Sequence, residues 1–141
     1  MWISTDGNGG NGGGGTVPFT LQFSLGPNLA AASITGRWAT DNCGTAQLNG
    51  GAAFSTISDC NPSDLNLGPF RNWTSFTVNS GFVNGTNTLA FNLQNTGGAQ
   101  AIRVEFLSSD STSTPEPATL GVMGAALLAL GVSRRKRGLK T

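Results

Sequence analysis

Pro18-Phe19-Thr20-Leu21-Gln22-Phe23-Ser24-Leu25 is the most regularly patterned stretch of the chain. Phenylalanine or leucine occupies every second position, and polar residues stand between them. Because successive side chains of a strand point to opposite faces, this period of two predicts a half-buried β-strand. Gly26-Pro27-Asn28 follows and ends the predicted strand, since these residue types favour turns.

Further short segments with strand character occur along the chain as far as residue 107. In order, they are predicted at residues 32–40, 45–48, 73–78, 88–93 and 101–107. Asn49-Gly50-Gly51 is a hairpin signal, whereas residues 52–69 lack a clear alternation and are predicted as a loop. No helical period occurs before residue 118, so the sequence predicts an all-β fold, a small β-sandwich.

The composition divides the chain into four parts. Residues 1–16 are predicted as a glycine-rich flexible segment, 17–107 as the sandwich domain, and 108–114 as a Ser/Thr linker. Residues 115–141 form a separate C-terminal part. It opens with Pro115-Glu116-Pro117, continues as an uncharged apolar run, and ends in a basic tail over residues 134–141.

The uncharged run over residues 118–133 is predicted as a single transmembrane helix. At about 1.5 Å per residue it would span roughly 24 Å, which is short for a hydrocarbon core of about 30 Å. The basic cluster Arg134-Arg135-Lys136-Arg137 is predicted to hold this end in the cytoplasm. A helix this short suits a segment that is held in the membrane only briefly, and a buried core helix and a permanent anchor are the alternatives.

Charge is distributed unevenly along the chain. Three arginines stand against seven carboxylates in residues 1–117, a net charge of −4, whereas the remaining residues carry five basic groups and no acidic one. Residues 1–117 contain no basic patch of the kind that indicates nucleic-acid binding. The acidic residues 1–117 are therefore expected to be exported, and the basic C-terminal end is expected to stay in the cytoplasm.

The residue types present exclude several kinds of chemistry. The chain has no histidine, so neither a Ser-His-Asp triad nor the usual imidazole ligands of zinc can form. Cys43 and Cys60 are expected to pair in an exported chain, two free thiols being the alternative. The protein is therefore predicted not to be an enzyme and to need no cofactor.

Candidate ligand residues are confined to turns and one aromatic side chain. Oxygen atoms of Asp41, Asn42, Asn49 and Asp59 could bind calcium or sugar hydroxyls, although turns favour Asp and Asn in any case. Trp73 is out of phase with its apolar neighbours and could stack on a sugar ring.

The C-terminal order of Pro-Glu-Pro, apolar run and basic end resembles the PEP-CTERM sorting signal of bacterial exported proteins. The resemblance implies that Pro115, Glu116 and Pro117 are recognised by exosortase, a membrane-embedded transpeptidase-like enzyme. It implies transient anchoring in the inner membrane with a cytoplasmic C-terminus, then release to the cell surface or extracellular matrix.

Residues 17–107 also resemble the galactose-binding-like jelly-roll domains of PEP-CTERM proteins. The resemblance rests on Ser33-Ile34-Thr35-Gly36-Arg37-Trp38, on Leu48-Asn49-Gly50 and on residues 76–89. Such domains begin with further strands, so the chain is expected to be truncated at its N-terminus. The function expected is structural or adhesive, in a biofilm or exopolysaccharide setting, and the alternative is a carbohydrate-binding module.

Overall fold

The computed structural model describes residues 1–4, 14–60, 68–96 and 100–114, and its regular structure is entirely β. Seven strands follow one another along the chain. They are β1 (Gly15–Leu25), β2 (Leu29–Asp41), β3 (Cys43–Leu48), β4 (Ala53–Ile57), β5 (Thr74–Val78), β6 (Gly85–Asn95) and β7 (Ala101–Ser113). The predicted all-β sandwich is confirmed.

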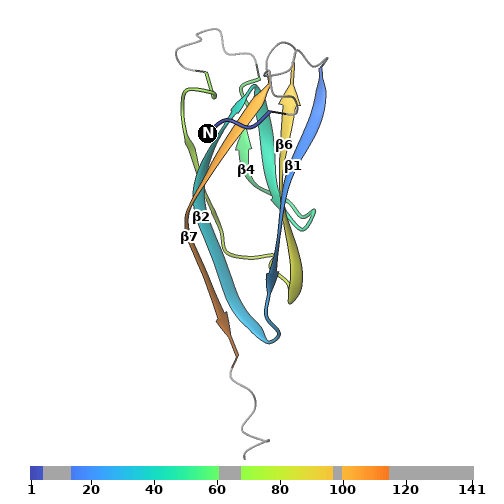
Figure 1. Cartoon of the computed structure of the whole chain (residues 1–141), viewed down its shortest axis with the longest axis vertical. Coiled ribbons are helices and arrows are strands. Elements are labelled where there is room, and N and C mark those ends of the chain that lie inside the picture. The colour runs from blue at the N-terminus through green and yellow to red at the C-terminus, as the bar shows by residue number, and fades with distance from the viewer. Residues whose placement is uncertain (5–13, 61–67, 97–99, 115–141) are drawn as a thin grey trace, which may run out of the picture.

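The strands form two antiparallel sheets that lie face to face (Figure 1). The larger sheet has the order β1-β6-β3-β4, and the smaller has the order β5-β2-β7. Strands β2 and β7 form the long pair of the smaller sheet, and their register runs from Leu29 opposite Ser113 to Asp41 opposite Ala101. Because β1 and β7 are edge strands of different sheets, each has one side without a strand partner in this order.

The core lies between the two sheets. Trp38, Leu89, Leu93 and Ile102 are essentially inaccessible to solvent. The Trp38 and Phe91 rings pack with centroids 5.4 Å apart. The indole Nε1 of Trp38 donates a hydrogen bond of 2.9 Å to Ser55 Oγ, which satisfies the polar atom of this buried side chain.

Two predicted segments differ from the structure. Residues 53–57 were expected to lie in a loop but form β4, because β3 supplies a ladder and Ile57 joins the core. Residues 108–113 were expected to be linker but continue β7. They pair with β2 through their backbone, and this pairing needs no apolar side chains.

The turn between β3 and β4 is of the predicted hairpin kind. Asn49 and Gly50 both have positive φ, 52° and 70°, and Gly51 N donates to Leu48 O at 2.9 Å. Two consecutive positive φ values characterise the type I′ turn, whose twist matches that of antiparallel strands. The Asn-Gly pair was therefore a reliable signal.

The predicted C-terminal helix and basic tail lie outside the described residues, as does most of the predicted glycine-rich segment. Within the residues that the structure describes, no helix is long and apolar enough to cross a membrane. The described part begins with a short N-terminal segment in which Ile3 forms an antiparallel bridge with Ile102 of β7. Its two backbone hydrogen bonds measure 2.8 and 2.9 Å.

Candidate functional site

The predicted ligand residues Asp41 and Asn42 lie at the end of β2, beside the disulfide. Cys43 and Cys60 are bonded, with Cα atoms 4.5 Å apart, which confirms the predicted pairing. Asn42 Nδ2 donates to Asp41 Oδ1 at 3.2 Å, and burial raises the pKa of the Asp41 carboxyl. The Asn42 side-chain oxygen accepts from both the backbone N–H and the hydroxyl of Thr96, at 3.1 and 3.2 Å.

Asp59 precedes Cys60 and is exposed, so the disulfide tethers it to the part of the fold that carries Asp41. A calcium ion needs several oxygen ligands converging on one point. Among the described residues, no group of three or more Asp, Glu, His or Cys side chains could hold a metal ion. Asp41 and Asp59 therefore belong to no such cluster in the part of the chain that the structure describes.

Asn49 lies apart from these residues, at the far end of β3. Its amide nitrogen donates to Gly81 O and to Asn87 Oδ1, both at 2.9 Å, and its oxygen accepts from Thr88 N at 2.8 Å. Asn87 is fully buried and holds the preceding loop through bonds with Val83 and Gly85. The geometry gives Asn49 a structural role at the hairpin turn.

Trp73 lies beside arginine side chains of the smaller sheet. The guanidinium carbon of Arg103 is 4.0 Å from the centroid of the Trp73 ring, and that of Arg37 is 4.6 Å from it. Arg103 also lies 4.9 Å from the Trp2 ring. Arg37 Nε in turn donates to Glu105 Oε2 at 2.6 Å. We call Trp2, Arg37, Trp73, Arg103 and Glu105 the outer-face cluster.

The register of β2 against β7 builds this cluster. Arg37 stands opposite Glu105, and Arg103 stands opposite Ala39, so these positions share the face of the sheet that points away from Trp38. Arg103 Nη2 donates to the Arg71 carbonyl at 3.4 Å, whereas its buried Nε has no partner among the described residues. The sequence singled out Trp73, which is half-buried, but not the arginines beside it, because their proximity depends on the pairing of strands that are distant in sequence.

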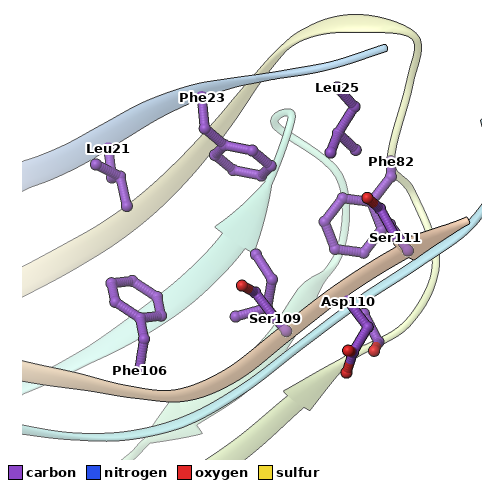
Figure 2. Close-up of a pocket in the computed structure, with 11 residues that line it drawn as sticks. Leu21, Phe23, Leu25, Phe82, Phe106, Ser109, Asp110 and Ser111 are labelled. Atoms are coloured by element: carbon purple, nitrogen blue, oxygen red, sulfur yellow. The ribbon is translucent and has the colours of Figure 1, made fainter. Parts of the chain in front are cut away.

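A cleft of about 360 Å³ opens between β1 and β7 (Figure 2). Leu21 and Phe23 project into it from β1, and Phe106 projects from β7 on the opposite side. Beyond Phe106, β7 places Ser109 and Ser111 along the cleft. Phe23 packs edge-on against Phe82, with ring centroids 6.3 Å apart, whereas Leu21 and Phe106 remain 45% and 43% exposed.

Comparison with known proteins gives one structural and one sequence similarity. A solved structure of a family 35 carbohydrate binding module from an environmental isolate aligns over 81% of this chain and 79% of its own, with 16% sequence identity and a TM-score of 0.36. No curated protein matches the chain.

The sequence similarity concerns the C-terminal part of the chain. Residues 113–137 match the PEP-CTERM protein-sorting motif. The matched segment includes Pro115-Glu116-Pro117, the uncharged run and the cluster Arg134-Arg135-Lys136-Arg137. The chain thus carries a PEP-CTERM sorting motif, which implies an exported protein directed to exosortase.

Proposed function

We propose that this protein is a non-catalytic component of the cell surface or extracellular matrix, with a structural or adhesive role. The sorting motif carries the proposal, because its match begins at residue 113, where β7 ends. The signal would therefore follow the sandwich directly in the chain. A C-terminal helix would hold the protein in the membrane with its basic end in the cytoplasm until exosortase acts at the Pro-Glu-Pro triplet.

A mechanism for this role requires only a stable exported domain and a removable signal. The disulfide Cys43–Cys60 suits an oxidising extracellular environment. The chain contains no histidine to serve as a general base near neutral pH. We therefore assign no catalytic step to the sandwich.

The test follows processing in a bacterium with and without its exosortase. One epitope is inserted at the exposed Gly50 turn and a second is added after Thr141. Loss of the second epitope and surface display of the first, both dependent on exosortase, are expected. Replacing Pro115, Glu116 and Pro117 by alanine should leave both epitopes in the membrane fraction, whereas the control Thr119→Ala should be processed. A mature, cytosolic protein that keeps both epitopes would contradict the proposal.

A carbohydrate-binding role for the sandwich is the second candidate function. It is favoured by the outer-face cluster, where Trp2 is 40% exposed and Trp73 is partly exposed. Aromatic rings stack on the apolar faces of sugars, and adjacent charged groups can bind hydroxyls or anionic substituents. The cleft between β1 and β7 is the competing location for a sugar.

Glycan-array binding distinguishes these locations. Trp73→Ala should abolish binding while the melting temperature shows a folded protein, and Leu21→Gln, which alters only the cleft, should bind as the wild type does. Loss of glycan binding in Leu21→Gln alone would indicate that the sugar binds in the cleft. An array on which the wild type binds no glycan would reject the carbohydrate function.

A further inference from the structure

We propose that the outer-face cluster binds an acidic polysaccharide, with Arg103 as the residue that recognises its anionic groups. The proposal rests on the second candidate function and narrows its ligand to polymers that carry carboxylate or sulfate groups.

Two of the three arginines of an acidic domain, Arg37 and Arg103, meet on one face. Residues 1–117 contain only three basic side chains, Arg37, Arg71 and Arg103. Arg37 and Arg103 share the Trp73 ring, and Arg103 reaches the backbone of Arg71. This gathering creates a local positive charge on a domain whose net charge is negative, and such a patch attracts polyanions.

Arg103 and Arg37 differ in how their positive charges are compensated. Arg37 is paired with Glu105 at 2.6 Å. Within the described ranges, no carboxylate lies within salt-bridge distance of Arg103, and its one hydrogen bond, to the Arg71 carbonyl, is long at 3.4 Å. The positive charge of Arg103 is therefore not neutralised by the part of the fold that the structure describes.

The two indole rings orient this guanidinium. Trp73 and Trp2 lie 4.0 and 4.9 Å from it, distances at which cation–π attraction holds an arginine in place. A guanidinium held in a fixed plane is suited to a carboxylate or sulfate, and because Nε is buried the two terminal nitrogens would donate to two acceptor oxygens. The neighbouring Trp2 ring, which is 40% exposed, supplies apolar surface for the ring of an acidic sugar.

The location favours a polymer as the ligand. The cluster draws residues from β2, β7, the residue before β5 and the N-terminal segment, on the outward side of a sheet. A chain of sugars can lie across such a surface and place successive acidic groups near Arg103 and Arg37. Repeated contacts then raise the apparent affinity beyond that of a single unit.

The experiment uses the full chain in a non-ionic detergent and measures retardation by polygalacturonate, dextran sulfate or neutral dextran in affinity gels. Both anionic polymers, and not dextran, should retard the protein, and added salt should weaken the effect. Arg103→Gln should weaken binding about tenfold, as expected for loss of a charge-assisted contact. Arg103→Lys keeps the charge but not the planar donors, so its affinity should lie between those of the wild type and Arg103→Gln.

A matched pair of acidic variants separates the cluster from general charge. Glu105→Gln frees Arg37 and should strengthen binding several-fold, whereas Asp110→Asn changes the net charge equally, at an exposed position further along β7, and should have little effect. Equal effects of the two variants would overturn the proposal, as would wild-type affinity in both Arg103 variants. Binding to dextran alone would overturn it and leave the carbohydrate function standing. If the protein bound none of these polymers and no glycan on the array, both this proposal and the carbohydrate-binding function would be rejected.

Discussion

Phe76 and Phe106 pack against each other across Gly36, with ring centroids 6.2 Å apart and planes at 83°. The two rings come from the strands on either side of β2, and both residues are register partners of Gly36. Glycine lets the rings approach over the central strand, because it places no side chain between them. This edge-to-face pair joins the core to the cleft, since Phe76 is buried and Phe106 lines the opening.

Gly36→Ala is expected to destabilise the domain by about 1–3 kcal/mol, as overpacking does in well-packed interiors. A Cβ at this position would lie 2.6 Å from Phe76 Cζ and 2.5 Å from the backbone oxygen of Glu105, which cannot move aside without disturbing the sheet. Urea denaturation measures the loss. Gly26→Ala is the control, because a Cβ there meets no atom within 4 Å. Equal stability of the two variants would show that this close packing is not needed.

Asn87→Ala should cost about 2–4 kcal/mol, because it removes several hydrogen bonds and leaves buried partners unsatisfied. Asn87 is fully buried, and its side chain bonds with Asn49 and with backbone groups of Val83 and Gly85. Asn84→Ala is the matched control, since Asn84 is exposed and its side-chain oxygen accepts from Leu29 N at 3.0 Å. The control should lose under about 1.5 kcal/mol. Chemical denaturation measures the loss in free energy of unfolding for both variants, and equal losses would contradict the special role of Asn87.

Reduction of the disulfide should lower the free energy of unfolding by roughly 3 kcal/mol, as the chain-entropy model gives for a loop of this size. The bridged residues are separated by 17 positions, and the bond ties β3 to the segment after β4. Thermal unfolding with and without a reducing agent measures the effect. The double variant Cys43→Ala/Cys60→Ala should unfold at a lower temperature and be insensitive to the reductant. A wild type whose melting temperature is unchanged by complete reduction would contradict this expectation.

The sequence predicted strands well where the alternation was strong and less well where pairing decided the structure. Residues 18–25 lie in β1 as predicted, because their strict alternation of apolar and polar residues follows from period two alone. Strand β4 was missed because its five residues gain their conformation from β3. The polar end of β7 was missed for the same reason.

The candidate sites likewise divide into those that could be predicted from the sequence and those that depend on strand pairing. The disulfide and the sorting motif could be read from residue types and their order along the chain. The outer-face cluster could not, because Arg37 and Glu105 are 68 positions apart and meet only through the register of β2 and β7. The cleft depends on which strands lie at the sheet edges, and alternation within one strand contains no information about sheet order.

Asp41 gives the domain a pH dependence whose sign follows from its surroundings. Burial raises the pKa of its carboxyl above the ordinary value of 3.8, so the folded state binds this proton more tightly than the unfolded chain does. Its contribution is therefore fully favourable below the unfolded pKa and is lost as the pH rises through the folded pKa. Urea midpoints measured from pH 3 to pH 7 should show this loss in the wild type but not in Asp41→Asn. Asp110→Asn, which removes an exposed carboxylate, controls for the change in net charge. If Asp41→Asn and the wild type kept the same difference in midpoint at every pH, the carboxyl would not be desolvated in the folded protein.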